Sequence, residues 1–552
     1  MEKEVLKSNT LVTLPTFQKE QNSQINKAEL KSEFMSAPLG LNKDTNFQID
    51  TINAIVSGVN KYKVAESIEH SQFYDEVLEK IKPIDFEDIV FPKLKDYKEQ
   101  LQGLEVGTPE YKKLKEIIKK FKVLQKHSIM VCIEELEKVV NKNLFGLAKS
   151  NGNIYAYNRN FWKKVEKEEF QNFLKNVALN FGVDKYDAKY HRTIDELYKQ
   201  FLASNYYKKP QQNADKVLIN LKNGTFELSG KEKFLRDFNQ NDFLTYQLNF
   251  DYDKEAKCPL FQDYLDKVLP NKDVQKLLAE YTGNIFLKNG NSLLKIENVM
   301  LLYGSGANGK SVFYEIINAL LGKENITSYS LQSLTNETGY QRAKIEDVLL
   351  NYAPEISTKM NTTIFKQLIS GEDVEARLPY GEPFILSQYA KFLFNCNELP
   401  KDVEQNNGFF RRFIIVPFNI TIPKEEQDKN LHTKIIKNEL SGIFNWALEG
   451  LERLIEQQGF TQVDEVNEML EQFKLESDSV AMFINEGYKK STENPYLISE
   501  LYKEYKEFCS EGGFVSLNSK NFRKRLESQS IEVKRTANGI SVYVESNIEC
   551  PF

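Results

Sequence analysis

The stretch Gly304-Ser-Gly-Ala-Asn-Gly-Lys-Ser311 decides the fold of this chain, because it has the pattern of a phosphate-binding loop. An apolar segment at 299–303 precedes it, and a helical pattern at 311–321 follows it. In such a unit glycines let backbone N–H groups surround the phosphates, and the helix N-terminus faces the anion. The sequence therefore predicts a nucleoside triphosphate site with Mg²⁺. The residues predicted to bind the nucleotide are Gly304, Gly306, Asn308, Gly309, Lys310, Ser311 and Val312, with the Ser311 hydroxyl as a metal ligand.

The composition is that of a multidomain protein rather than a membrane protein. Of the 552 residues 41% are apolar and 28% charged, and no window approaches the roughly 20 apolar residues of a transmembrane helix. The first residues lack the pattern of a secretory signal, so we expect a cytoplasmic protein. The five cysteines stand far apart, which supports neither disulfides nor a zinc site. Because the net charge is -6, any contact with nucleic acid must come from local basic surfaces.

Changes of pattern along the chain predict five segments. We expect a flexible N-terminus at 1–45, a charged helical region at 46–126, a mixed α/β-helical domain at 127–255, an ATPase domain at 256–455 and a winged-helix-like domain at 456–552. The fold class is thus predicted to be α/β, with a helical N-terminal domain, a phosphate-loop core and a C-terminal winged-helix-like domain.

One predicted helix of the charged region has a basic face. In the segment 111–122 the apolar residues Leu114, Ile117, Ile118 and Phe121 fall on one side, and lysines occupy the other. Such a face could contact DNA. It also fits a helix that packs against the protein through its apolar side and exposes its lysines to water, which is the more common use.

The C-terminal segment has the order helix, helix, hairpin. Apolar residues share one helical face at 498–508, glycines follow at 512–513, and a second helix is expected at 517–526. Strands at 531–535 and 540–544 then flank a turn at Asn538-Gly539. This order is typical of a winged helix, a fold that serves either DNA binding or protein contacts. The residues predicted to contact DNA here are Lys520, Arg523 and Lys524.

Polar residues at the ends of two further predicted strands suit triphosphate hydrolysis. The strand 348–353 leads to Pro354-Glu355, and a strand beginning at Phe392 ends in Asn397. A carboxylate in this place can hold the water shell of a metal or polarise the attacking water, and an amide can sense the γ-phosphate. Glu355 is therefore predicted to be catalytic and a metal ligand, and Asn397 to be catalytic. The alternatives are a surface glutamate that merely ends a strand and an asparagine that forms a turn.

Two arginines, Arg411 and Arg412, precede a fourth predicted strand. A guanidinium group can stabilise the charge that builds up during phosphoryl transfer, and ring ATPases supply it from a neighbouring subunit. An ordinary surface arginine pair fits the same residues when they are considered alone.

The order of these motifs resembles that of superfamily 3 helicases of the phage, plasmid and poxvirus-type primase-helicase branch. The resemblance rests on the phosphate loop, the strand ending in Glu355, the pattern Lys366-x-x-x-x-Gly-x-Asp-x-x-x-Arg377, the Asn397-x-Leu-Pro strand, and Arg-Arg-Phe before Pro-Phe. It is dense from 304 to 418 and weaker at 153–162, 251–259 and 442–450.

The resemblance implies an AAA+-like P-loop ATPase core that assembles as a homohexameric ring and moves 3′ to 5′ on single-stranded DNA. It implies ATP and Mg²⁺ as cofactors, single-stranded and forked DNA as partners, and catalytic roles for Lys310, Glu355, Asn397 and Arg412, with Arg412 as the arginine that acts across a subunit interface. The function expected from it is a DNA helicase that replicates a phage, a plasmid or another mobile element.

A hairpin with its turn at Tyr380-Gly-Glu-Pro383 would project into the channel of such a ring. Its tip lacks the lysines of the family pattern, so the candidates for DNA contact are Arg377, Lys391 and Tyr380, the last by stacking on bases. At the N-terminus the nearest match to the metal-binding carboxylates of a primase is Asp85-Phe-Glu-Asp88, which is predicted to be an acidic helix start instead. A separate primase or initiator is therefore an expected partner.

Two other functions fit the sequence. The protein could be an ATP-switched, DNA-binding replication initiator or loader with little unwinding, or an ATPase that remodels protein partners. Loss of DNA-stimulated hydrolysis on substitution of Arg377 and Lys391 would favour a translocating motor over a switch driven by the C-terminal segment. Hydrolysis that is indifferent to single-stranded DNA would favour action on proteins.

Overall fold

The computed structural model describes residues 69–150, 152–205, 215–354, 360–399, 404–536 and 539–547. These residues form a mixed α/β protein with one five-stranded parallel sheet and four smaller antiparallel sheets, so the predicted α/β class is confirmed. Glu355, the segment 1–45 and Asn538 lie outside the described residues. Among the helices that are described, none combines the length and the apolar character needed to cross a bilayer.

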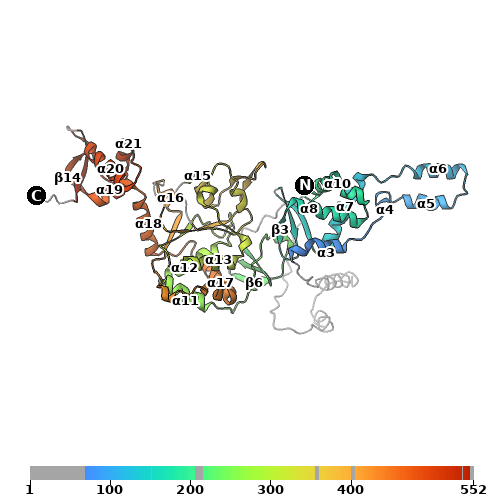
Figure 1. Ribbon diagram of the computed structural model, residues 1–552, viewed down its shortest axis with the longest axis horizontal. Helices are drawn as coiled ribbons and strands as arrows, with labels where there is room; N and C mark the ends of the chain where they lie inside the picture. The colour runs from blue at the N-terminus through green and yellow to red at the C-terminus, as the bar shows by residue number, and fades with distance from the viewer. Residues whose placement is uncertain are drawn as a thin grey trace, which may run out of the picture. The chain divides into compact units, whose positions relative to one another are not determined.

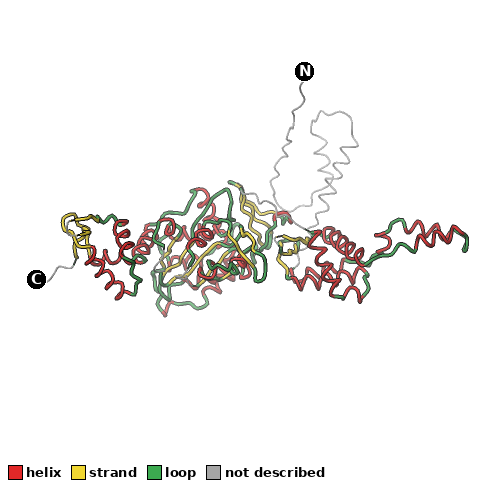
Figure 2. Tube along the Cα trace, turned by 90° about the horizontal axis from the view of Figure 1, so that it is seen from above, coloured by secondary structure: helices red, strands yellow, loops and turns green. Residues whose placement is uncertain are grey.

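The charged region is helical where the structure describes it. Its elements are the short 3-10 turn η1 (His70–Gln72) and the helices α3 (Phe73–Lys80), α4 (Phe86–Val90), α5 (Leu94–Gln102) and α6 (Pro109–Ile118). The next helix, α7 (Gln125–Lys142), begins at the end of this region. Asp85 begins α4, because its Oδ1 accepts hydrogen bonds from the N–H groups of Glu87 and Asp88 at 2.8 and 3.3 Å. The prediction of an acidic helix start is therefore confirmed. Helices α5 and α6 lie side by side as a hairpin (Figure 1, Figure 2).

A small antiparallel sheet and three helices follow. The elements are β1 (Gly146–Ser150), β2 (Asn153–Tyr157), β3 (Trp162–Val165), α8 (Lys167–Phe181), α9 (Lys185–Lys189) and α10 (His191–Ser204). β2 confirms the strand expected at 153. Gly146 has to be glycine, because a Cβ there would lie 2.7 Å from the indole ring of Trp162.

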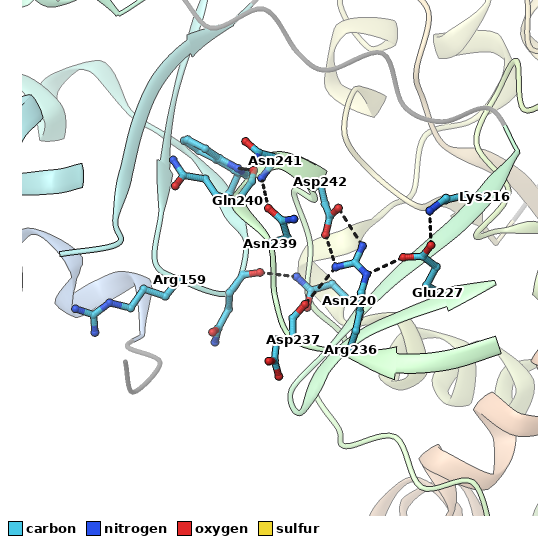
Figure 3. A network of polar contacts seen from close by, with 12 residues as sticks. Arg159, Lys216, Asn220, Glu227, Arg236, Asp237, Asn239, Gln240, Asn241 and Asp242 are labelled. Atoms are coloured by element: carbon cyan, nitrogen blue, oxygen red, sulfur yellow. Dashed lines mark hydrogen bonds and ion pairs between the residues drawn. The ribbon is translucent and has the colours of Figure 1, made fainter. Parts of the chain in front are cut away.

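A second antiparallel sheet, made of β4 (Lys216–Leu221), β5 (Gly224–Ser229) and β6 (Glu232–Arg236), carries a polar network (Figure 3). The buried carboxylate of Glu227 accepts hydrogen bonds from Lys216 Nζ at 2.5 Å and from Arg236 Nε at 2.7 Å. The other side of the Arg236 fork donates to both carboxylate oxygens of Asp242 at 2.9 and 3.0 Å. Asp242 ends the turn η2 (Gln240–Asp242), so the network fixes this turn against the sheet.

The parallel sheet has the strand order β13-β7-β12-β9-β8. Its strands are β7 (Val299–Tyr303), β8 (Ile326–Thr327), β9 (Leu350–Ala353), β12 (Lys391–Cys396) and β13 (Phe413–Pro417). Because the strands are parallel, their carboxyl ends share one edge. Both faces are buried, which explains why the strands read as continuous apolar runs in the sequence.

Helices cover the two faces of this sheet (Figure 1). One face packs on α11 (Pro259–Val268), α12 (Lys272–Asn284), α13 (Lys310–Leu321) and α17 (Leu431–Glu456), and the other packs on α15 (Thr362–Ile369) and α18 (Asp464–Glu476). Gly442 and Gly450 let α17 approach its neighbours closely, because a Cβ there would lie 2.4 and 2.3 Å from the backbones of Lys257 and Ala279. The shorter elements of this region are η3 (Lys323–Asn325), α14 (Leu331–Leu334), η4 (Arg342–Ile345), α16 (Asn407–Phe410) and η5 (Lys424–Glu426).

The predicted hairpin between the second and third strands is present. It consists of β10 (Val374–Arg377) and β11 (Pro383–Leu386), which pair in the register Val374 with Leu386 and Arg377 with Pro383. Arg342 fixes its base: this buried guanidinium donates to the carbonyl oxygens of Glu375 at 2.8 Å and Leu334 at 2.9 Å.

The C-terminal segment contains more structure than the sequence predicted. The elements are α19 (Ser479–Gly487), β14 (Tyr488–Leu497), α20 (Ile498–Gly512), α21 (Ser519–Ser528), β15 (Val533–Thr536) and β16 (Gly539–Ser546). The two expected helices and the expected hairpin are all found. The sequence reasoning missed α19 and β14, the latter because its pairing with β16 is interrupted between Lys490 and Pro495 and no alternation of apolar residues marks it.

Candidate nucleotide site and DNA-contacting surfaces

The predicted phosphate loop lies at the carboxyl edge of the parallel sheet, between the end of β7 and the first residue of α13. Gly304 and Gly309 have φ angles of 152° and 92°. Residues with a Cβ atom rarely adopt such positive φ angles, so both positions favour glycine. A Cβ on Gly304 would lie 2.4 Å from Asn308 Nδ2, and one on Gly309 would lie 2.7 Å from Val268 Cγ1. Gly306 is exposed and has open space around it. The loop is thus packed tightly on its inner side and open on its outer side.

Contacts from distant parts of the chain hold the loop. Asn308 Nδ2 donates to the carbonyl oxygen of Phe418 at 2.9 Å, and the Tyr264 hydroxyl donates to the carbonyl oxygen of Gly309 at 2.9 Å. These partners are separated by 110 and 45 residues in the sequence, and no local signal marks them. Tyr264 and Phe418 therefore hold the loop by contacts that the sequence reasoning missed.

The Lys310 ammonium group is surrounded by neutral oxygens. Its Nζ donates to the carbonyl oxygens of Gly304 at 2.5 Å and Ser305 at 3.1 Å and to Asn308 Oδ1 at 3.1 Å. The side chain is buried, and this burial lowers the pKa of Lys310. Within the described part of the chain no carboxylate forms an ion pair with it. A buried cation without a counter-ion is unfavourable, and an anion at the loop would remove that cost.

Of the two predicted binding residues at the start of α13, Ser311 is placed to contact a phosphate group or its metal ion and the side chain of Val312 is not. Ser311 is exposed in the first helical turn, where its hydroxyl is accessible. Val312 instead packs its side chain on the apolar core and donates its N–H to the carbonyl oxygen of Gly309 at 2.9 Å. Among the described residues no cluster of three or more His, Cys, Asp and Glu side chains forms a metal site. A metal ion held by Ser311 and Glu355 would therefore need phosphate oxygens and water as its further ligands.

The sheet edge brings Asn397 beside the loop. Cys396 pairs with Tyr303 across β12 and β7, and the N–H of Gly304 donates to the carbonyl oxygen of Cys396 at 3.0 Å. Asn397 is the next residue and is exposed. β9 ends at the same edge, one strand further away, and the chain leaves it towards Pro354. The loop, Ser311 and Asn397 are thus gathered at one edge, as predicted from the parallel strands.

The two arginines before β13 lie in different surroundings. The Arg412 side chain is 10% exposed, its Nη2 donates to Ser370 Oγ at 2.8 Å, and its Nη1 donates to the carbonyl oxygen of Gly408. The Arg411 side chain is 59% exposed and pairs with Glu297 at 3.3 Å. The structure therefore places Arg412, the predicted interface arginine, inside its own subunit, and it places Arg411 on the surface.

The hairpin presents two of its three predicted DNA-contacting residues. Tyr380 is fully exposed at the tip and has a φ of 59°, and Arg377 is exposed and donates from Nε to the carbonyl oxygen of Gly381 at 2.9 Å. Lys391 begins β12 and donates from Nζ to Asn289 Oδ1 at 2.9 Å, and burial lowers its pKa to about 8. The structure thus brings Arg377 and Tyr380 together at the tip. Lys391 does not lie there, because its ammonium group is hydrogen-bonded to Asn289.

The basic helix of the C-terminal segment is only partly accessible. On α21 Lys520 and Lys524 are exposed, and Arg523 pairs with Glu527 at 2.8 Å. Arg525 points elsewhere: it donates to Asp478 Oδ2 at 2.7 Å and to Gln405 Oε1 at 2.8 Å.

Gln405 belongs to the chain between the sheet edge and the arginine pair. Its neighbour Glu404 pairs with Lys366 of α15 at 2.8 Å, and Gln405 Nε2 donates to the carbonyl oxygen of Ser477 at 2.8 Å. Through Arg525 this segment is therefore tied to α21 as well as to α15. The sequence reasoning did not identify this connection.

Three families match parts of the chain. The family described as D5 N terminal like matches residues 138–270, the Family of unknown function (DUF5906) matches residues 302–412, and the family described as Poxvirus D5 protein-like matches residues 475–547. The middle match covers the phosphate loop and ends at the arginine pair. Together with the viral relatives described next, these matches support a D5-like primase-helicase family.

Two of the curated relatives are the following viral proteins. A putative helicase of Acanthamoeba polyphaga mimivirus is 26% identical over 273 residues, which is 46% of this chain and 25% of that protein. A putative helicase of Invertebrate iridescent virus 3 is 24% identical over 355 residues, which is 55% of this chain and 36% of that protein. The chain thus matches between a quarter and somewhat more than a third of the length of these relatives.

Among solved structures, the apo form of the NrS-1 C-terminal region is similar over 74% of this chain and 98% of that chain, with 12% identity and a TM-score of 0.42.

Proposed function

We propose that this protein is an ATP-dependent DNA helicase of the superfamily 3 type that serves the replication of a virus, phage or other mobile element. The observation that carries the proposal is the buried Lys310 ammonium, which has neutral oxygens but no carboxylate around it in the described part of the chain. A polyphosphate at the open side of the loop would supply the missing negative charge. The similarity to viral putative helicases supports the choice of DNA unwinding among the reactions that such a loop serves.

In this proposal the residues at the sheet edge have separate roles. The backbone of the loop from Gly304 to Gly309 and the Lys310 ammonium hold the phosphates of ATP, and the Ser311 hydroxyl and Glu355 hold Mg²⁺. The bound metal ion supplies charge neutralisation at the phosphates. Asn397, exposed one residue beyond β12, orients the attacking water or contacts the terminal phosphate.

The arginine that acts on a neighbouring subunit is assigned to Arg411 rather than Arg412. A guanidinium that stabilises charge in the site of another subunit must be accessible before assembly, and only Arg411 of the pair is. Arg412 supports it from within, because its bonds to Ser370 and Gly408 fix the turn that presents Arg411. This assignment fits a ring, expected to be a hexamer, with an ATP site at each subunit interface.

The β10–β11 hairpin is proposed to contact single-stranded DNA in the channel of the ring. Tyr380 combines full exposure with a left-handed backbone conformation, and neither feature stabilises the subunit. An exposed tyrosine ring offers a surface on which a base can stack, and Arg377 beside it can contact the phosphates. The C-terminal α19–α21 segment, with its three helices and three strands, is proposed to be a winged helix.

The test of the proposed function is an unwinding assay on 3′-tailed and 5′-tailed duplexes, with Lys310→Ala as the inactive control. We expect ATP-dependent unwinding of the 3′-tailed substrate alone. Unwinding of the 5′-tailed substrate alone would overturn the polarity. Hydrolysis stimulated by single-stranded DNA without unwinding of either substrate would identify an initiator or loader, and hydrolysis indifferent to DNA would identify an ATPase that acts on proteins.

The hairpin assignment has its own test. Tyr380→Ala should lower DNA-stimulated hydrolysis and unwinding by about 10-fold, since base–aromatic stacking contributes about 1–3 kcal/mol per base, and it should leave DNA-free hydrolysis unchanged. The matched control is Tyr186→Ala, which removes a tyrosine that is 82% exposed on α9. Equal effects of the two substitutions would contradict the role of Tyr380.

A further inference from the structure

We propose that the α5–α6 hairpin, together with the turn that follows it up to Lys122, is a docking surface for the phosphate backbone of duplex DNA. The choice of DNA as the polyanion rests on the proposed function. The surface itself is identified by its charge, its exposure and the kind of side chains it presents.

The charge of this region is opposite to that of the chain. Residues 91–126 contain ten lysines, no arginine and five acidic residues, whereas the whole chain has a net charge of -6. An acidic protein repels DNA as a whole, so a local basic surface is the place where a duplex can approach it.

Three of the lysines, Lys112, Lys113 and Lys115, lie on one side of α6. At 100° per residue they occupy about half of the circumference, and the apolar residues occupy the other half. Three more, Lys119, Lys120 and Lys122, follow in the turn after α6, and all six lysines are exposed.

Nothing in the described part of the chain covers this surface. α6 has no buried residue, and in α5 only Leu94 is buried. The hairpin is instead held together by its own aromatic residues, since Phe121 lies 5.2 Å from Phe91 and stacks at 5.8 Å on Tyr97, between ring centroids. The lysine face is therefore not the solvated back of a helix that packs its other face deep in the core.

Most of these lysines lack an acidic partner. Lys119 pairs with Glu116 at 2.6 Å, but among the described residues no carboxylate pairs with Lys112, Lys113, Lys120 or Lys122. Their charges are therefore available to an external anion.

The type of side chain favours the backbone of a duplex over single-stranded DNA. Recognition of single strands uses exposed aromatic rings, but Phe91, Tyr97 and Phe121 are engaged with one another, and the Lys115 ammonium lies 5.6 Å from the centre of the Tyr111 ring. A set of ammonium groups, without the forked donors of arginine, matches phosphates and does not read bases. We therefore expect binding that is independent of sequence and sensitive to salt.

The experiment compares two full-length quadruple variants. The first is Lys112→Gln, Lys113→Gln, Lys120→Gln and Lys122→Gln, and the matched control neutralises four exposed lysines elsewhere, Lys267→Gln, Lys323→Gln, Lys429→Gln and Lys437→Gln. Glutamine keeps the helix propensity of lysine, so the hairpin should stay folded, which circular dichroism checks. The measurement is the dissociation constant for a blunt fluorescent duplex without ATP, over a range of salt concentrations.

The hairpin variant should bind the duplex at least about 10-fold more weakly at low salt, and its log–log salt dependence should flatten by up to about three to four ions. The control variant should stay within about 2-fold of the wild type. Wild-type affinity in the hairpin variant, or an equal loss in the control, would overturn the proposal. An equal loss of binding to a single strand of the same length would overturn the assignment to duplex DNA.

This test is independent of the motor. The hairpin variant should keep its DNA-free hydrolysis, and Lys310→Ala should bind the duplex like the wild type because Lys310 lies in the nucleotide loop. A chain that fails the unwinding assay but loses duplex binding in the hairpin variant would sink the proposed function and leave the docking surface standing.

Discussion

The phosphate loop and the α5–α6 hairpin both depend on lysine, and they place it in opposite surroundings. In the loop a single ammonium, that of Lys310, is buried among neutral oxygens. In the hairpin six ammonium groups are exposed, three on α6 and three in the turn after it. Removal of a charge from water is costly, so the burial of Lys310 destabilises the loop, whereas the solvated lysines have little effect on the stability of the hairpin.

The difference shows how the surroundings of a cation indicate its role. A buried cation that contacts only neutral oxygens among the described residues acts alone, and its function is lost when that one residue is changed. Exposed cations act together, so each one contributes a fraction of the binding and none is essential. The predictions below test this contrast between single, buried charges and shared, exposed ones.

The largest effect is expected at Lys310. Lys310→Met should lower ATP hydrolysis by at least about 100-fold, the scale on which loss of one charge-stabilising donor acts. The free energy of unfolding should stay the same or rise, because the substitution removes a buried charge that has no carboxylate partner in the described part of the chain. Phosphate release and urea unfolding measure the two quantities. A clear loss of stability would show that Lys310 is a structural residue, and Lys276→Met on the exposed surface of α12 serves as the control.

Substitutions of Arg411 and Arg412 should have different effects, the first on ATP hydrolysis and the second on stability. Arg411→Ala should lower hydrolysis about 100-fold or more with little change in stability, because its pair with Glu297 is exposed. Arg412→Ala should lower the free energy of unfolding by about 2–3 kcal/mol, since it deletes a buried, hydrogen-bonded guanidinium.

Mixed assemblies decide whether the assigned arginine acts across an interface. Subunits with Lys310→Met and subunits with Arg411→Ala should recover part of the hydrolysis when they are combined, because some interfaces then join an intact loop to an intact arginine. Recovery with Arg412→Ala subunits but not with Arg411→Ala subunits would reverse the assignment made from burial.

Patterns of neighbouring residues predicted those parts of the site that consist of one continuous stretch of sequence. The loop, the strands β7, β9, β12 and β13, and the hairpin of β10 and β11 follow from residue types that are adjacent in the sequence, and their order along the chain implied the shared edge of a parallel sheet. Asn397 was found beside the loop because parallel strands end at the same edge.

The contacts that hold these parts in place are not local and could not be predicted in this way. Tyr264 and Phe418 reach the loop from 45 and 110 residues away, and Arg342 holds the hairpin across 33 residues through a bond to a backbone carbonyl. The burial of Arg412 follows from a bond to Ser370, which lies 42 residues earlier. A backbone carbonyl carries no residue-specific signal, so such partners become visible only in the folded chain.

A compensated buried charge should behave differently from Lys310, and Glu227 provides the case. Burial alone would raise the pKa of Glu227, but hydrogen bonds from Lys216 and Arg236 outweigh it and hold the pKa below its ordinary value. Glu227→Gln should therefore lower the free energy of unfolding by about 2–3 kcal/mol at pH 7, because two cations lose their shared partner.

The pH dependence has a defined sign. A carboxyl group whose pKa is lowered by folding stabilises the protein above its unfolded pKa of about 4.3, and this contribution disappears as the pH falls through the lower, folded pKa. The difference between the wild type and Glu227→Gln should thus shrink on acidification below about pH 4.3. Glu232→Gln, an exposed residue of β6, should show no such trend, and a difference that grows in acid would contradict the role of Glu227.

The smallest effect on stability is expected where the charges are shared and exposed. Lys119 and Glu116 form an ion pair at 2.6 Å, and both side chains are more than 60% exposed. Lys119→Gln should move the thermal midpoint by less than about 1 °C, because water screens the pair, and should weaken duplex binding by only about 2-fold, because five lysines remain. A loss of affinity as large as that of the quadruple variant would show that one lysine dominates the surface, and the contrast with Lys310 would then fail.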